Sequence, residues 1–186
     1  LNWNEQIILC FSLSKIGLPG VRTGIVVANP QVVKAISSLN AIVNLAPTRF
    51  GAAIATPLLQ DDRLKDLSDN HIRPFYQGQA KLAVQLLKQE LGDLPNDAMK
   101  IHKPEGAIFL WVWFKDLPIT TVELYERLKA KGTLIIPSEH FFVGVDTENF
   151  KHAHECIRLS IAQDDETLKK GIATIGEVVR AVYANQ

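Results

Sequence analysis

A lysine and an arginine lie close together in a short stretch of sequence that is rich in glycine. Residues 12–24 read SLSKIGLPGVRTG, in which Lys15 follows Ser12 and Ser14, and Arg22 comes after two glycines. A lysine placed directly after a buried strand is a stronger nucleophile, because burial disfavours its charged form, and it can form a Schiff base with an aldehyde. A guanidinium and hydroxyl groups are good partners for phosphate oxygens. The stretch therefore predicts a site for pyridoxal 5'-phosphate, which carries both groups, although a solvated lysine and a surface ion pair of Arg22 would give the same spacing.

A second arginine stands within an otherwise apolar segment near the end of the sequence. Residues 157–162 read IRLSIA, which predicts a strand that contains Arg158. A buried guanidinium is costly unless it is paired. Its partner could be a carboxylate of the protein itself, or the carboxylate of a bound amino acid, which the planar fork of arginine can grip with two hydrogen bonds. Arg158 is therefore a candidate substrate-binding residue.

Together these motifs resemble those of the fold-type I pyridoxal-phosphate aminotransferases, the aspartate aminotransferase superfamily. The resemblance is carried by S-x-S-K, glycines and R-x-G in residues 12–24, and by the arginine strand in residues 157–162. Two weaker similarities lie between them, PEGAIFLW at residues 104–111 and KGTLIIPSEHFF at residues 131–142. In many members of the family the lysine and the arginine are one residue further apart. The motifs occur in the family's order and span essentially the whole sequence.

The resemblance implies a role for each residue of these motifs. Lys15 would bind pyridoxal 5'-phosphate covalently and would move the α-proton of the substrate as a general base and acid. Ser12 and Arg22 would hold the cofactor phosphate, with Ser14 beside them, and Arg158 would bind the substrate carboxylate. The implied partners are amino-acid and keto-acid substrates and a second copy of the chain in a homodimer.

Further side chains near these motifs could take part in the site. By the resemblance, Arg49 lies where family members reach across the dimer, although an ordinary interface ion pair is the alternative. His140 could line the substrate entrance. Core packing is favoured for Phe141 and Phe142 over a role in an apolar side-chain pocket.

Hydrophobic periodicity predicts strands that alternate with helices, which is typical of the α/β class. Pro57 weakens the second helix, and Ser68 or Asp69 is expected to cap the third. Asp164 or Asp165 is expected to cap the last. Strands are predicted at residues 6–11, 25–28, 108–114, 134–136 and 156–162, and helices at residues 31–45, 52–59, 68–91, 121–131 and 165–183.

The resemblance also implies a domain organisation, that of the C-terminal part of a fold-type I pyridoxal-phosphate-dependent transferase. Residues 1–65 would be the end of the large, cofactor-binding domain and its sheet. Residues 66–91 would form the long interdomain helix. Residues 92–186 would form the small C-terminal α/β domain.

Composition excludes several other classes of protein. The 186 residues are 47% hydrophobic, which is incompatible with a disordered chain, and the formal net charge of zero argues against nucleic acid or an anionic membrane as a main partner. No apolar run is long enough to span a membrane, and no signal-peptide pattern begins the sequence. Cys10 and Cys156 are best explained as small buried apolar groups in a reducing, cytoplasmic compartment, and the histidine spacing matches no metal motif.

Several family features are missing upstream of the lysine. The family places an aspartate against the pyridine nitrogen, a tyrosine on the ring hydroxyl and a glycine-rich phosphate loop before the lysine, whereas Glu5 is the only acidic residue before Lys15 here. Without the aspartate the cofactor is a poorer electron sink. We therefore expect the sequence to be a fragment without useful transaminase activity of its own.

Three alternatives stay open from the sequence. A pyridoxal-phosphate-dependent lyase of the same fold would use the same lysine and arginines. The aminotransferase-like ligand domain of a transcriptional regulator would need a basic helix-turn-helix ahead of residue 1. A plain α/β binding module would leave Lys15 and Arg158 without a shared purpose.

Overall fold

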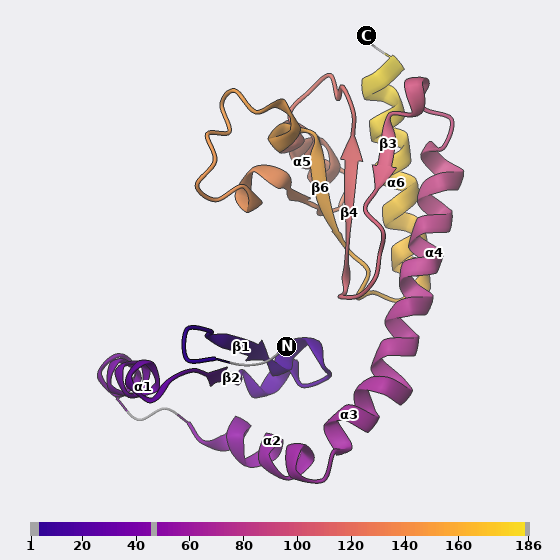
Figure 1. Ribbon diagram of the computed structural model, residues 1–186. Helices are drawn as coiled ribbons and strands as arrows, with labels where there is room; N and C mark the ends of the chain where they lie inside the picture. The colour runs from indigo at the N-terminus through magenta and orange to yellow at the C-terminus, as the bar shows by residue number, and fades with distance from the viewer. Residues whose placement is uncertain (1–3, 46–47, 185–186) are drawn as a thin grey trace. The chain divides into compact units, whose positions relative to one another are not determined.

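The chain folds into α-helices and β-strands whose order Figure 1 shows. The computed structural model describes residues 4–45 and 48–184. Contacts divide the chain into two units, Leu1–Pro74 and Phe75–Gln186, so the boundary falls near the start of the longest predicted helix, residues 68–91. The first three residues, which the sequence analysis used in its search for a signal peptide, lie outside the described residues.

The first unit is built around an antiparallel hairpin of β1 (Leu9–Ser12) and β2 (Gly24–Val27), in which Leu9 lies opposite Val27. Two short 3₁₀ turns connect the strands, and three α-helices and a π-helical turn follow. Leu13 is 1% exposed and packs with Ala55 and Leu64, so the connection between the strands is anchored on two of the helices. The elements of this unit are β1, η1 (Leu13–Lys15), η2 (Pro19–Val21), β2, α1 (Pro30–Asn44), α2 (Phe50–Gln60), α3 (Arg63–Leu67) and η3 (Ser68–Ile72).

The expectation that the first strand is buried is wrong. All four residues of β1 are exposed, and Phe11 keeps 54% of its accessible surface. Within the described parts of the chain, β1 pairs with β2 alone, so this ribbon is not part of a larger sheet. Cys10 is consequently exposed and is not the buried apolar group that the sequence predicts.

The second unit contains an antiparallel four-stranded sheet in the order β3-β4-β6-β5. The α/β class is confirmed, and β3, which is only three residues long, is the strand that the sequence analysis missed. The strands are β3 (Met99–Ile101), β4 (Phe109–Phe114), β5 (Ile136–Pro137) and β6 (Cys156–Ser160).

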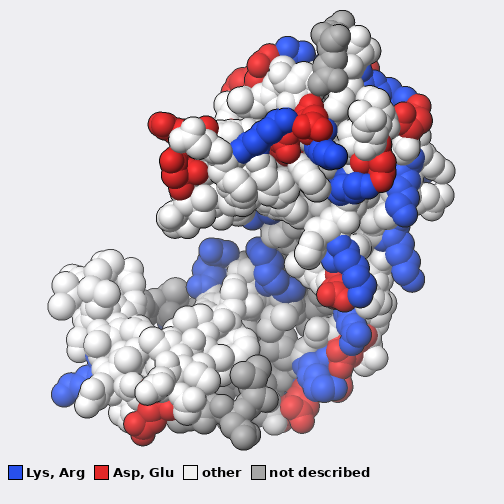
Figure 2. All heavy atoms as spheres, turned by 45° about the horizontal axis from the view of Figure 1, so that its top comes forward, with Lys and Arg blue, Asp and Glu red and all other residues white. Residues whose placement is uncertain are grey.

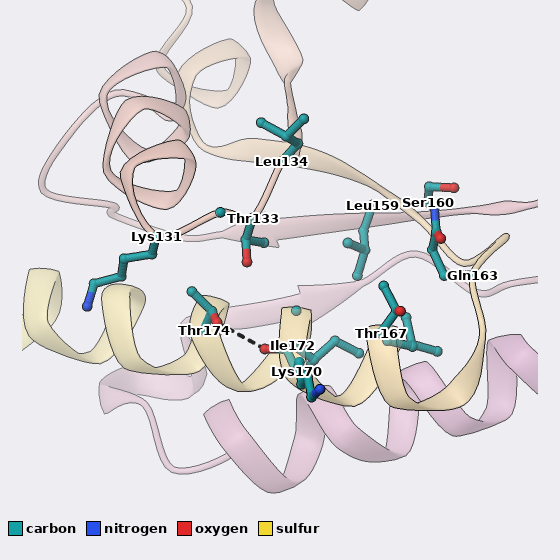
Figure 3. A pocket seen from close by; sticks show the side chains of 13 residues that line it. Lys131, Thr133, Leu134, Leu159, Ser160, Gln163, Thr167, Lys170, Ile172 and Thr174 are labelled. Atoms are coloured by element: carbon teal, nitrogen blue, oxygen red, sulfur yellow. Dashed lines mark hydrogen bonds between the residues drawn. The ribbon is translucent and has the colours of Figure 1, made fainter.

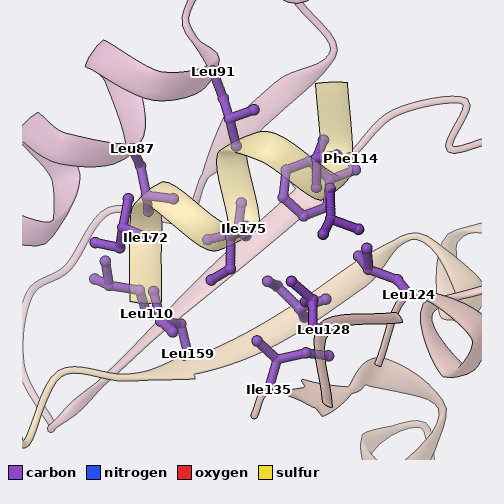
Figure 4. Packing of buried hydrophobic residues seen from close by; sticks show 14 of the residues in the cluster. Leu87, Leu91, Leu110, Phe114, Leu124, Leu128, Ile135, Leu159, Ile172 and Ile175 are labelled. Atoms are coloured by element: carbon purple, nitrogen blue, oxygen red, sulfur yellow. The ribbon is translucent and has the colours of Figure 1, made fainter. Parts of the chain in front are cut away.

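One face of this sheet forms the core. Along β4 the buried positions alternate strictly, so Leu110, Val112 and Phe114 point to one face, and β6 adds Ile157 and Leu159. Figure 4 shows Leu110, Phe114 and Leu159 packed against buried residues of the three helices of the unit. The helices are α4 (Arg73–Leu91), α5 (Thr121–Ala130) and α6 (Asp165–Ala184).

Helices α4 and α6 run side by side in the same direction (Figure 1). Gln79 Nε2 donates to Asp165 Oδ1 at 2.7 Å, and further along Arg180 Nη1 donates to Asp93 Oδ2 at 2.8 Å. Between these contacts a Cβ on Gly176 would lie 3.0 Å from the side chain of Glu90, so glycine permits the close approach of the two helices.

The predicted capping residues have different outcomes. Asp164 caps α6, because its Oδ1 accepts from Thr167 N at 2.9 Å, and this bond lowers the pKa of Asp164 below its usual value. The expected cap at Ser68 or Asp69 is wrong. The chain is already helical from Arg63, and Ser68 has helical dihedral angles in a π-helical turn that leads directly into α4.

Figure 2 shows a difference in surface charge between the two units: large parts of the first carry no charged side chain in this view, whereas both signs are mixed over the second. Helix α1 contributes to this, since Lys34 is its one charged residue and none of its residues is buried. Within residues 4–45 and 48–184, no helix combines the length and apolar character needed to cross a membrane.

Candidate functional site

The four residues predicted around the cofactor lie together in the connection between β1 and β2. Lys15 ends the turn η1, and Ser12 caps that turn by accepting from Ser14 N at 3.3 Å. Arg22 returns to the same turn, where its Nη1 donates to Ser14 Oγ at 3.3 Å. A primary amine, two hydroxyls and a guanidinium are thereby gathered on one short loop.

The backbone of this loop brings Arg22 back to the turn. Leu13 N donates to Thr23 O and Leu18 N donates to Leu13 O, both at 3.1 Å, which closes the connection on itself. Arg22 has a left-handed backbone with φ of 46°, a conformation that costs a non-glycine residue about 1–3 kcal/mol. The surrounding contacts must offset this strain, and such strain is concentrated at functional sites.

The glycines of the loop serve the fold rather than an approach of the backbone to a ligand. Gly17 has φ of +103°, and a Cβ added to it would collide with the side chain of Ile72. A Cβ on Gly24 would lie 3.1 Å from Phe11 O on the neighbouring strand, whereas one on Gly20 would meet no atom within 4 Å. The requirement for glycine at positions 17 and 24 is therefore internal to this unit.

The exposure of these groups differs from the prediction of a buried lysine. Lys15, Ser12 and Arg22 are exposed and Ser14 is half-buried. The reason is the one given for Cys10: the strand that precedes the lysine, β1, belongs to a two-stranded ribbon, and all four residues of β1 remain exposed. The amine is accessible on the surface of this chain, and burial is not what would activate it here.

Arg158 lies in the other unit, in the middle of β6, between Trp111 of β4 and Ile136 of β5. Its guanidinium carbon is 4.2 Å from the ring centroid of Phe109 and 4.7 Å from that of Phe141. Its Nε is buried and has no hydrogen-bond partner, and it forms no ion pair with any residue in the described part of the chain. No carboxylate of the described residues is therefore its partner. Phe141 is 40% exposed, so the prediction that it packs in the core is wrong.

Arg158 contributes to the walls of two cavities. The larger, of about 630 Å³, has mostly apolar walls that include Val122, Tyr125 and Ile136, and His140 also lines it. The smaller, of about 300 Å³, is formed largely by residues 102–107 together with Phe109 and Trp111. The first is large enough for an amino acid and joins a cationic group to an apolar surface.

A third cavity of about 480 Å³ lies between the α5–β5 connection and α6 (Figure 3). It contains none of the site residues that the sequence predicts. Its polar side chains are largely engaged by the protein: Lys131 bonds to Glu177, and Thr174 donates to the Lys170 carbonyl. It is therefore a weaker candidate than the cavities at Arg158.

Sequence reasoning missed a pair of side chains in the segments before β6. In the short helical turns η5 (Ser138–Phe141) and η6 (Lys151–His154), His154 Nδ1 lies 2.7 Å from Glu139 Oε1, and His154 Nε2 lies 2.7 Å from Thr147 O. The bond to Glu139 is the main reason that the pKa of His154 is raised above its usual value, and the bond to the Thr147 carbonyl is the second. The histidine spacing carries no signal for the pair, because the contact joins residues 15 apart in irregular structure.

Arg49 and the other histidines do not form a recognisable binding site among the described residues. Arg49 is exposed just before α2. Across the part of the chain that the structure describes, no group of three histidine, cysteine or acidic side chains is placed to bind a metal ion.

Comparison with known proteins agrees with this geometry. The chain belongs to the class I and II aminotransferases, since the model of that family matches residues 2–175. Its fold is that of a part of a fold-type I aminotransferase. Among curated proteins it is 42% identical to the valine–pyruvate aminotransferase of Escherichia coli (strain K12), over 98% of this chain and 43% of that protein.

Two solved structures are similar over the whole chain. The valine–pyruvate aminotransferase of Salmonella typhimurium LT2 superposes with a TM-score of 0.90 at 40% identity, and this chain covers 47% of it. A protein of Psychrobacter arcticum 273-4, provisionally described as an amino-acid aminotransferase, superposes with a TM-score of 0.94 at 70% identity, with 42% of it covered. The chain thus spans less than half the length of these relatives.

Proposed function

We propose that this chain is the C-terminal part of a pyridoxal-phosphate-dependent aminotransferase that exchanges the amino group between valine, or a similar aliphatic amino acid, and pyruvate. The observation that carries the proposal is the loop on which Ser12, Ser14, Lys15 and Arg22 meet. Family membership and the names of the relatives support the kind of reaction and the substrates.

The donor set of this loop fits the cofactor. Arg22 and the hydroxyls of Ser12 and Ser14 offer a charged fork and two small donors for a phosphate, and the Arg22–Ser14 bond holds two of these groups together. Lys15 supplies a primary amine on the same turn, which an aldehyde requires. Pyridoxal 5'-phosphate, when bound, supplies an electron sink for the bond-breaking steps at the α-carbon.

Each residue of the chain then has a defined task. Arg22, Ser12 and Ser14 would bind and orient the phosphate, and the Lys15 amine would bind the aldehyde carbon. Lys15 would also act as the general base that takes the α-proton of the substrate and as the general acid that returns it. Arg158 binds the substrate carboxylate, because its guanidinium has no carboxylate partner within the described protein and its Nε hydrogen is unbonded.

The substrate side chain would lie in the larger cavity at Arg158. Its apolar walls, with Val122 and Ile136 among them, suit an aliphatic group better than a charged one. Valine and pyruvate differ in size but share the carboxylate that Arg158 would bind, so one site can serve both halves of the reaction.

The complete enzyme would need more than this chain. We propose that it is a homodimer, with Arg49 reaching toward the neighbouring site, and that residues 1–65, 66–91 and 92–186 are the remnant of the large domain, the interdomain helix and the small domain. The chain alone is expected to be inactive, since the groups that the family places on the pyridine ring are not among the residues before Lys15.

Covalent trapping tests the cofactor site. The chain is mixed with pyridoxal 5'-phosphate, reduced with borohydride and mapped by peptide mass spectrometry, in parallel with Arg22→Ala and the control Arg63→Ala, whose arginine forms a surface ion pair with Asp61. We expect label on Lys15, with an apparent affinity that falls about 10- to 100-fold in Arg22→Ala, the loss of one charge-assisted bond, and stays unchanged in Arg63→Ala.

Turnover and labelling in the full-length enzyme test the catalytic role of Lys15. Lys15→Ala should abolish turnover with valine and pyruvate there. Near-normal turnover in that variant, or label spread over many lysines of the full-length protein, would show that another amine binds the cofactor.

A further inference from the structure

The side chain of His154 contacts the protein on both sides of Phe141. Its Nδ1 is 2.7 Å from Glu139 Oε1, two residues before the phenylalanine, and its Nε2 is 2.7 Å from Thr147 O, which follows it. The segment that carries Phe141 is therefore tied at both ends to a single imidazole. That segment brings the phenyl ring to 4.7 Å from the Arg158 guanidinium carbon and 5.4 Å from the ring of Trp111.

Both partners of His154 are acceptors. A carboxylate and a carbonyl oxygen have no hydrogen to donate at these positions, so each ring nitrogen must carry one. The neutral ring has one N–H and can serve only one of the two partners, whereas the imidazolium serves both. The second oxygen of Glu139 is buried and has no hydrogen-bond partner, so this carboxylate depends on the charge of His154.

The segment is anchored to the start of β6 at one more point. Ser138 Oγ accepts from Cys156 N at 3.2 Å, and this serine is 0% exposed. The anchor fixes the beginning of the segment. Beyond it, Phe141 packs against Trp111 and Phe142 against Phe150, and the bonds of His154 join Glu139 to the Thr147 carbonyl. Phe141 is the residue of this segment that reaches Arg158, so the tie acts on the carboxylate site through the phenyl ring.

We propose that His154, in its imidazolium form, is a positioning residue for Arg158: by bonding Glu139 and the Thr147 carbonyl together it holds Phe141 against the guanidinium and keeps the fork oriented for a carboxylate. The inference rests on the proposed carboxylate-binding role of Arg158 and adds regulation of that site by pH. Loss of the proton frees one of the two partners, and the phenyl ring loses its fixed position.

The charged groups around His154 define the direction of the effect. Glu139 on η5 is the carboxylate in contact, Asp146 and Glu148 flank Thr147, and the neighbours on its own segment are Lys151, His152 and Glu155, of which Lys151 is paired with Asp116 and Glu155. The two bonds raise the pKa of His154, so the ordered arrangement is complete at low pH and is lost as pH rises through that raised pKa.

Carboxylate binding without chemistry tests the proposal. Isovalerate, an aliphatic carboxylate that has no amino group, is titrated by calorimetry into the full-length, cofactor-loaded enzyme between about pH 6 and about pH 9. The affinity should fall about threefold to tenfold over this range, the size of one partly exposed cation–π contact. His154→Gln should show the weaker affinity at every pH, and the control His71→Gln, an exposed histidine of the other unit, should follow the wild type.

Two further variants keep the outcome interpretable. Phe141→Leu keeps an apolar side chain but removes the ring, and it should also bind weakly with a flattened pH profile. Arg158→Ala reports on the proposed function alone. If Arg158→Ala abolishes binding while His154→Gln and Phe141→Leu match the wild type at every pH, the positioning role is overturned and the carboxylate site stands; if Arg158→Ala binds normally, both proposals fall.

An independent readout needs no ligand. The imidazole of His154, followed by NMR titration of the same enzyme, should have a pKa above the usual histidine value, and Glu139→Gln should bring it back down. An unshifted His154 pKa in the wild type would contradict the contact geometry on which the proposal stands.

Discussion

Arg158 and Cys156 share one face of β6, because side chains alternate along a strand, yet their surroundings give them opposite character. The fork of Arg158 is partly exposed beside two cavities and lacks a counter-ion among the described residues. Cys156 is 0% exposed and its Sγ lies 3.5 Å from His152 Nε2. Burial is the main reason that the pKa of the Cys156 thiol is raised to about 12, which makes it an inert packing group.

The two cysteines of the chain should therefore react very differently. A thiol reagent added to the folded chain near neutral pH should label Cys10, which is exposed, and leave Cys156 unmodified until the protein is denatured. The measurement is the number of thiols that react before and after denaturant. The folded Cys10→Ser variant should not be labelled by the thiol reagent. Rapid labelling of that variant would mean that Cys156 is accessible.

At the scale of elements, local patterns predicted the fold well where the signal is local. The apolar periodicity gave β4 and α5 to within one residue, and the acidic residue before α6 identified its cap. The spacing of Lys15 and Arg22 likewise indicated a shared loop, which the structure contains. In each case the residues that decide the outcome are near neighbours in the chain.

Sequence patterns failed where distant residues decide. Burial of β1 depends on what pairs with it, and β2 alone leaves Cys10 exposed. The contact of Phe141 with Arg158 depends on the path of irregular segments that no periodicity describes. Apolar composition suggested a core role for Phe141, but a cation–π contact also favours a phenyl ring.

The junction of β4 and β6 depends on one buried acidic residue. Glu155 is 5% exposed, and its two carboxylate oxygens accept separately from Trp113 Nε1 at 2.8 Å and Asp116 N at 3.0 Å. The Glu155 carbonyl accepts from Phe114 N at 2.9 Å, so both the side chain and the backbone of Glu155 join the end of β4 to the start of β6. Lys151 Nζ, at 3.5 Å from the carboxylate, supplies a positive charge.

Glu155→Gln should weaken this junction. The amide keeps one acceptor oxygen and presents an N–H group to the other donor, so one buried donor loses its partner at a cost of about 1–3 kcal/mol. Chemical denaturation followed through tryptophan fluorescence would measure the change. Glu148→Gln, at an exposed position with no side-chain bond to that junction, is the matched control and should leave stability within about 0.5 kcal/mol.

At the scale of the molecule, the two units have very different cores. In the unit Leu1–Pro74, the buried apolar cluster among the described residues consists of Leu13, Ala55 and Leu64, whereas the cluster of the other unit draws on three helices and two central strands of its sheet. The first unit also exposes Ile42 at 75% and Val43 at 70% on α1. An apolar surface of this kind favours self-association of the chain.

Hydrogen exchange of the chain at low concentration should therefore separate the two units. The free energy of local opening follows the apolar surface buried, so amides of β1, β2 and α1 should exchange orders of magnitude faster than those of β4, β6 and α6. Raising the protein concentration should slow exchange selectively in α1, because association covers its apolar residues. Ile42→Lys should remove that dependence, whereas Val143→Lys, at a still more exposed position of the second unit, should not. Equal protection of both units at low concentration would mean that the small cluster around Leu13 is stabilised by more than its buried area provides.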